Sequence, residues 1–254
     1  MKAEYSRYLL EFKRPSGTSR GVLLEKETFI LKISENGKEG TGECAIFRGL
    51  SFDDRPDYED KLKWLCENIQ QDSEFLKEEL KEFPSIWFGY EQAVLNLKNG
   101  ENLYFPSEFT EGKTPIVING LIWMGDINYM EEQIQDKLEK GFHCIKLKIG
   151  VDWKSEHEIL QKLRQKFSKD RLELRVDANG GLKKEEAKIV LQQLADLHIH
   201  SIEQPIKAGN RNDMAELCLE TPTPIALDEG LIGITDFSRS EERRVGKECR
   251  SRWS

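Results

Sequence analysis

The chain has 254 residues, a formal net charge of −8 and a pI near 5.3. This acidic balance argues against nucleic acid as a partner, because phosphate binding requires clustered lysine and arginine side chains. No stretch approaches the roughly 18 consecutive apolar residues of a membrane span, and the first residues lack the apolar core of a signal peptide. The sequence therefore predicts a cytoplasmic protein that does not bind a membrane.

The first 107 residues predict an α+β domain. Asn36-Gly37 is a dipeptide typical of a hairpin turn between two strands. Asn99-Gly100 is a typical end for an apolar helix. A polar, proline-containing segment, 101–113, then leads to the rest of the chain. The expected elements before it are strands at 21–34 and 37–47 and helices at 57–70 and 85–99.

From Thr114 the pattern changes to strands that alternate with helices. Such alternation predicts parallel strands joined by right-handed crossovers, and five units fit either a doubly wound sheet or a barrel. Ser155 and Glu158 have the spacing of a capping box at the start of the second helix. The five predicted strands are 114–123, 143–150, 171–180, 199–205 and 223–230.

Residues 239–254 differ in composition from everything before them. They show no apolar period and are dense in arginine, so we interpret them as a non-native tail. The predicted organisation is therefore an α+β domain at 1–107, a partial βα domain at 108–238 and the tail.

Charged side chains end the second to fifth strands of the βα series. They are Lys148, Asp177, Glu203 and Asp228, at intervals of 29, 26 and 25 residues, about one βα repeat each. In a βα barrel the catalytic residues lie at this end of the strands. Three converging carboxylates without histidine or cysteine favour a hard divalent cation, so Mg²⁺ is predicted, with Mn²⁺ as a substitute. Lys146 shares a strand face with Lys148 and places a second cation there.

Four motifs in this region carry a family resemblance: IKLKIG, RVDANGG, IEQPI and ALDEG. In this order and spacing they resemble the enolase superfamily, in the branch with K-x-K on the second barrel strand. That branch includes muconate-lactonising enzymes, dipeptide epimerases and o-succinylbenzoate synthases. The segments RPSGTSRG, INGLIWMG and DEGLIGI most resemble the o-succinylbenzoate synthases of menaquinone biosynthesis. The resemblance implies an α/β fold, a modified TIM barrel of which about five βα units are present, with an N-terminal α+β capping domain.

The resemblance also implies a reaction on a small carboxylate. Mg²⁺ would be held by Asp177, Glu203 and Asp228, and Lys148, with Lys146 beside it, would remove the proton next to the substrate carboxylate. For an o-succinylbenzoate synthase, 2-succinyl-6-hydroxy-2,4-cyclohexadiene-1-carboxylate then loses water and becomes 2-succinylbenzoate. The implied enzyme class is a carbon–oxygen lyase.

Four further residues receive subsidiary assignments. Arg20 is expected on a loop that covers the substrate, as in the family, or else as a solvated surface arginine. Asn179 and Gln204 follow predicted ligands and are expected to orient them, or else to cap loops. Glu229, next to Asp228, is expected to act as a supporting acid.

Two alternatives remain open at this point. A dipeptide epimerase or N-acylamino-acid racemase would use the same metal site, and a non-catalytic metal-binding barrel fragment would use it without turnover. The family also places a lysine at the end of the sixth strand, opposite Lys148, but only EGLIGITDFSRS follows Asp228 before the tail. We therefore expect this chain by itself to be inactive and poorly folded. The sequence leaves the oligomeric state open.

Overall fold

The computed structural model describes residues 1–18, 21–100, 103–123 and 127–233, and the predicted tail lies outside these ranges. The chain divides into two compact units, Met1–Pro115 and Ile116–Ser254. The boundary predicted between residues 107 and 108 falls in the segment that connects the last helix of the first unit to the first strand of the second. No helix in the described ranges is long and apolar enough to cross a membrane.

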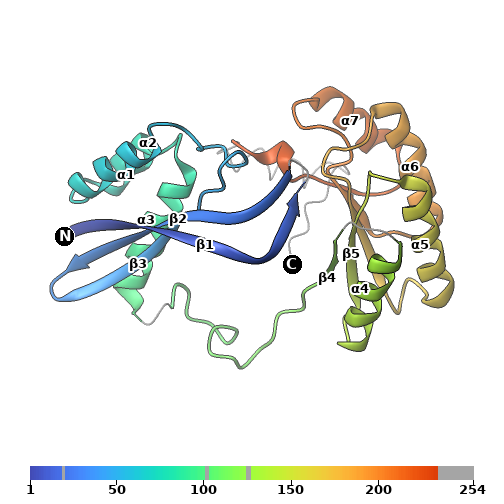
Figure 1. Ribbon diagram of the computed structural model, residues 1–254, viewed down its shortest axis with the longest axis horizontal. Coiled ribbons are helices and arrows are strands. Elements are labelled where there is room, and N and C mark those ends of the chain that lie inside the picture. The colour runs from blue at the N-terminus through green and yellow to red at the C-terminus, as the bar shows by residue number, and fades with distance from the viewer. Residues whose placement is uncertain (19–20, 101–102, 124–126, 234–254) are drawn as a thin grey trace. The chain divides into compact units, whose positions relative to one another are not determined.

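The first unit is an antiparallel sheet with three helices, as the α+β prediction requires (Figure 1). Its strands lie in the order β1-β2-β3, and the turn between β2 and β3 has Asn36 and Gly37 at φ 51° and 76°. The predicted hairpin is therefore confirmed. The elements are β1 (Lys2–Thr18), β2 (Gly21–Glu35), β3 (Lys38–Cys44), α1 (Tyr58–Glu67), α2 (Ser73–Glu79) and α3 (Pro84–Asn99).

Close contact between β3 and α3 holds the first unit together. A Cβ atom added at Gly42 would lie 1.9 Å from the carbonyl oxygen of Gly89, so only glycine lets the helix approach the strand. Asp53, which is 2% exposed, accepts hydrogen bonds from the backbone N–H of Ser85 at 2.8 Å and from its hydroxyl at 2.6 Å. This carboxylate satisfies a free N–H in the first turn of α3.

The second unit contains the predicted strand and helix alternation. Its strands form one parallel sheet in the order β4-β5-β6-β7-β8. A doubly wound sheet would reverse its strand order at a switch point, whereas strands that follow the chain order are those of a barrel. The elements are β4 (Gly120–Ile122), α4 (Ile127–Glu139), β5 (Cys144–Lys148), α5 (Trp153–Lys166), β6 (Glu173–Asp177), α6 (Lys184–Asp196), β7 (Ser201–Glu203), α7 (Arg211–Glu220), β8 (Ile225–Ala226) and the 3₁₀ turn η1 (Glu229–Leu231).

The two faces of the parallel sheet differ in character. Ile145 and Leu147 of β5 are fully buried in the apolar core that the sheet forms with its helices, which gather on one side of the strands (Figure 1). Cys144, Lys146 and Lys148 alternate with them and are only partly buried. The pleat thus directs the two lysines away from the helices and toward the inner side of the sheet.

Two local predictions were wrong. The first strand was predicted over 114–123 but is restricted to β4, because the register with β5 starts at Gly120 opposite Ile145 and nothing in the described ranges pairs with the residues before it. The capping box of Ser155 and Glu158 is also not formed. Asp152 caps α5 instead and accepts from the backbone N–H of Ser155 at 3.4 Å.

Candidate active site

The strand register brings the predicted site residues to one edge of the sheet. Lys148 lies opposite Asp177 in the β5–β6 pairing, and Asp177 lies opposite Glu203 in the β6–β7 pairing. Glu203 lies opposite Ala226 of β8, and Asp228 follows two residues later. Asp228 therefore does not end the fifth strand as predicted, because β8 stops at Ala226 and Asp228 lies in the turn after it. Lys148, Asp177 and Glu203 end three adjacent strands, and Asp228 completes this row beyond the carboxyl end of the fourth.

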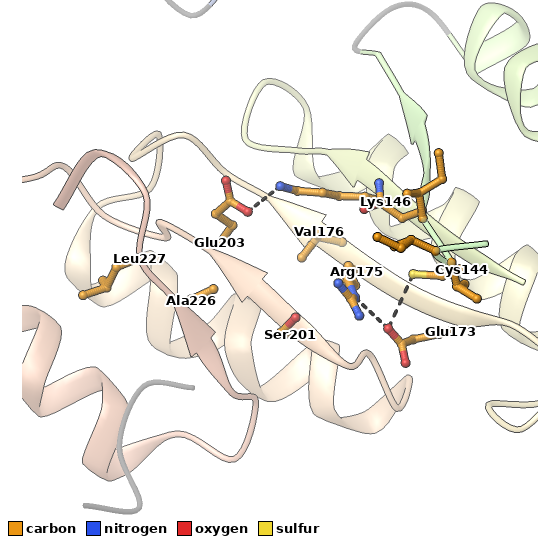
Figure 2. A pocket seen from close by; sticks show the side chains of 13 residues that line it. Cys144, Lys146, Glu173, Arg175, Val176, Ser201, Glu203, Ala226 and Leu227 are labelled. Atoms are coloured by element: carbon orange, nitrogen blue, oxygen red, sulfur yellow. Dashed lines mark hydrogen bonds and ion pairs between the residues drawn. The ribbon is translucent and has the colours of Figure 1, made fainter. Parts of the chain in front are cut away.

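Each lysine of the K-x-K strand contacts a carboxylate. The Lys148 ammonium donates to Oδ2 of Asp177 at 3.1 Å and to Oδ1 of Asn179 at 2.6 Å. The Lys146 ammonium donates to Oε2 of Glu203 (Figure 2). It also lies 3.7 Å from Oδ2 of Asp177. Asp177 is only 3% exposed, so these pairs compensate a carboxylate that is shielded from water.

The acids influence one another. Burial raises the pKa of Glu203, the hydrogen bond from Lys146 opposes that rise, and the charge of Asp177 adds to it. Burial also raises the pKa of Asp228, and the negative charges of Glu229 and Asp177 raise it further. Glu203 is partly buried and Asp228 is the more exposed of the two. Both lie among other acids, and such an environment attracts a cation.

The donor chemistry at this edge fits Mg²⁺, because the row offers carboxylate oxygens, the ligands that a hard cation prefers. In the described part of the chain, no three histidine, cysteine, aspartate or glutamate side chains converge closely enough to ligate a metal as they stand. Lys146 and Lys148 contact two of the three acids instead. The assignment of Asp177, Glu203 and Asp228 as ligands therefore stays a prediction that rests on their positions.

The subsidiary residues divide into two groups. Asn179 donates its backbone N–H to Oδ1 of Asp177 at 3.0 Å, and its side-chain amide donates to Oε1 of Glu229 at 3.2 Å. The Gln204 side chain accepts from the backbone N–H of Asp228 at 3.2 Å. Asn179 and Gln204 thus contact the row directly, and Glu229 is held through Asn179. Arg20 lies outside the described residues.

A cavity of about 650 Å³ opens on the inner side of the sheet and includes Lys146 and Glu203 (Figure 2). It extends from them toward the amino ends of the strands, where Arg175 is hydrogen-bonded to Glu173 at 2.6 Å. The thiol of Cys144 lies 3.4 Å from the same carboxylate, and burial raises its pKa to about 11. Sequence reasoning assigned no role to this second charged group, although the alternation of β6 places Arg175 and Glu173 on the same face as Asp177.

Trp123 is a further neighbour that sequence reasoning missed. Its ring centroid lies 6.0 Å from the Lys148 ammonium, at the outer limit of a cation–π contact. The residue follows β4 directly, so the position after a barrel strand was the available signal.

Comparisons with known proteins agree with this architecture. The profile of the family "Enolase C-terminal domain-like" matches residues 129–246, which extends into the segment interpreted as a tail. The o-succinylbenzoate synthase of Desulfotalea psychrophila is 38% identical over an alignment of 273 positions, which covers 94% of this chain and 74% of the relative. The crystal structure of MenC from the same organism superposes with a TM-score of 0.76 at 33% identity and covers 98% of this chain and 76% of that one.

Other similar proteins extend the comparison. The o-succinylbenzoate synthase of Thermosynechococcus elongatus, whose crystal structure carries Mg in its active site, shares the fold with a TM-score of 0.76 at 22% identity, over 96% of this chain and 72% of that one. The L-amino acid-D/L-Glu epimerase of Francisella philomiragia is 30% identical over 126 residues, or 49% of this chain and 35% of the relative. The match to the synthases therefore includes the α+β unit, and the match to this epimerase covers about half of the chain.

Proposed function

The chain belongs to the enolase superfamily, in the branch of the o-succinylbenzoate synthases, and on that premise we propose that its site serves their dehydration. The substrate is 2-succinyl-6-hydroxy-2,4-cyclohexadiene-1-carboxylate and the product is 2-succinylbenzoate, an intermediate of menaquinone biosynthesis in the cytoplasm. The observation that carries the proposal is the in-register row of Lys148, Asp177 and Glu203 in a chain that matches a synthase along 94% of its length.

Lys148 is proposed as the base. Its side chain is 19% exposed at the carboxyl end of β5, so it is not sealed within the apolar core. The neutral amine takes the proton from the carbon next to the substrate carboxylate. The same proton then leaves with the hydroxyl group as water, and the ring becomes aromatic. Asp177 and Asn179 hold the Lys148 nitrogen in place between these two transfers.

Asp177, Glu203 and Asp228 are proposed as the residues that hold Mg²⁺, for which Mn²⁺ is a substitute. When bound, the ion supplies positive charge that stabilises the negative charge developing on the substrate carboxylate. The pairing of a lysine base with Mg²⁺ is established chemistry of the enolase superfamily. Lys146 keeps Glu203 paired and adds a second positive charge beside the substrate.

Turnover is tested in two proteins. One is this chain, and the other, called the joined protein, is residues 1–238 joined to the part of the Desulfotalea psychrophila relative that lies beyond the match. We expect the joined protein to dehydrate the substrate and this chain not to, because no lysine in its described part faces Lys148 from a sixth strand. Lys148→Met in the joined protein should lower kcat by about 10³-fold. A Lys148→Met variant with unchanged kcat would refute the assignment of the base.

The epimerase alternative is tested on the same samples. An L-amino acid-D/L-Glu epimerase matches about half of this chain, which is the observation that keeps this function under consideration. The joined protein is incubated with L-Ala-D/L-Glu in deuterated water, and deuterium incorporation beside the carboxylate is followed by mass spectrometry. Efficient exchange without any dehydration of the cyclohexadiene would replace the proposed function by epimerisation.

A further inference from the structure

Gln204 has an unusual backbone conformation for its residue type. Its φ angle is 39°, in the left-handed region that disfavours side chains with a Cβ atom, and it follows the predicted ligand Glu203 directly. Glycine would adopt this conformation at little steric cost. A strained residue at a functional edge indicates that its side chain has a role there.

Gln204 is 1% exposed, and its side chain makes three hydrogen bonds to backbone groups of the described residues. Its Oε1 accepts from the N–H of Asp228 at 3.2 Å and from the N–H of Gly230 at 2.9 Å. Its Nε2 donates to the carbonyl oxygen of Ile206 at 2.9 Å. One amide therefore connects the end of β7 to both sides of the turn that carries Asp228.

The strand pairing explains why such a connection is needed. The register between β7 and β8 ends where Glu203 lies opposite Ala226, and the backbone N–H of Gln204 donates to the Ala226 carbonyl oxygen at 2.9 Å. Asp228 lies beyond this last bond, so the β ladder does not fix its position. The Gln204 side chain continues the link for two more residues.

We infer that Gln204 is a positioning residue, whose buried amide fixes the turn at Asp228 so that Asp228 and Glu203 face one cation. The inference deepens the proposed function and rests on its metal assignment. Gly230 contributes by leaving space: a Cβ atom there would lie 3.1 Å from Oε1 of Gln204. On the other side of the turn, Glu229 is held by the Asn179 amide at 3.2 Å.

The experiment measures Mn²⁺ affinity of the complete 254-residue chain by electron paramagnetic resonance titration of free Mn²⁺. Gln204→Met preserves the side-chain length and removes all three hydrogen bonds. We expect about tenfold weaker Mn²⁺ binding, the usual effect of removing a group that orients a ligand. Hydrogen exchange at the Asp228 and Gly230 amides should also become faster in the metal-free protein. Gln204→Gly relieves the strained φ and serves as a second variant if the methionine variant does not fold.

The matched control is Thr223→Val. Thr223 is 2% exposed and donates to the carbonyl oxygen of Leu191 at 2.7 Å, so this change removes a buried hydrogen bond of the same unit without touching the turn. It should lower Tm and leave Mn²⁺ affinity unchanged. If Gln204 had only a structural role, its variants would behave in the same way.

The outcomes separate this inference from the proposed function. Loss of Mn²⁺ binding in Asp228→Asn with unchanged affinity in folded Gln204 variants overturns the inference and leaves the proposed metal site standing. Unchanged affinity in Asp228→Asn, or no Mn²⁺ binding by either the parent chain or the joined protein, overturns the metal site, and the inference falls with it. Weaker binding in both, with the Thr223→Val control unaffected, supports both.

Discussion

Acidic side chains have different neighbours in the two units of the chain. In the first unit Asp53 accepts two hydrogen bonds from Ser85, and this pairing serves the start of α3. In the second unit Glu203 and Asp228 lie beside other acids, and burial raises the pKa of both. Burial of a carboxylate is therefore not in itself a sign of function. The distinguishing feature is the neighbours: neutral donors stabilise structure, whereas clustered acids and lysines prepare a site for a charged ligand.

Removal of an acid from the cluster in the second unit should change metal affinity most. Asp177→Asn removes a predicted ligand and the partner of Lys148. Loss of an outer partner already lowers metal affinity by up to about 100-fold, so loss of a direct ligand should lower Mn²⁺ affinity by at least about that factor. Titration of the 254-residue chain with Mn²⁺ measures this effect. The control is Asp53→Asn in the other unit, which should bind Mn²⁺ like the parent chain. Equal affinity in both variants would remove Asp177 from the ligand set.

Removal of Asp53 from the first unit should change stability and not metal affinity. Asp53→Ala leaves the backbone N–H and hydroxyl of Ser85 without their acceptor at the start of α3, which should lower the free energy of unfolding by roughly 2 kcal/mol. Urea denaturation followed by circular dichroism measures the change. The comparison fails for Asp53 if the variant unfolds at the same urea concentration as the parent chain.

A cation far from the site should also affect stability alone, and by a smaller amount. Arg164 in α5 donates to the carbonyl oxygens of Leu197 at 2.8 Å and of Leu172 at 2.9 Å, so it connects two loops at the end of the second unit away from the site. Arg164→Met should lower stability by about 1–2 kcal/mol and leave Mn²⁺ affinity unchanged. Denaturation and metal titration of the same sample test both statements. A fall in affinity would show that the far end of the unit influences the site.

The smallest effect is a pH dependence in the first unit. The hydrogen bond from Lys26 to Glu43 lowers the pKa of that carboxyl, so its contribution to stability is present above the unfolded value of about 4.3 and is lost as pH falls through the folded value. Because Glu43 is 41% exposed, solvent screening keeps the contribution below about 1 kcal/mol. Thermal denaturation of the parent chain and Lys26→Met between pH 6 and pH 3 measures it. The difference in Tm should shrink toward the acid end, and a constant difference would contradict the assignment.

Local patterns determined much of the fold. The turn at Asn36-Gly37 depends on residues that tolerate positive φ, which is a property of the residues themselves. Strand β1 and helix α2 were not predicted. Leu9 and Leu10 are consecutive and are 46% and 40% exposed, so this part of β1 lacks the alternation that identifies a strand. Helix α2 has only seven residues, too few to establish a helical period.

The repeat spacing of Lys148, Asp177, Glu203 and Asp228 was visible in the sequence. The first three end their strands, and Asp228 follows the last strand by two residues. The alternation of strands and helices did not specify the strand order. In the structure this order follows the chain, which excludes the doubly wound alternative. The tertiary structure also decided the side-chain partners, including the contact of Gln204 with the Asp228 backbone 24 residues later. Hydrophobic periodicity and turn chemistry depend on residues a few positions apart, so they can be recognised in the sequence. Register across strands depends on how segments far apart in the sequence pack.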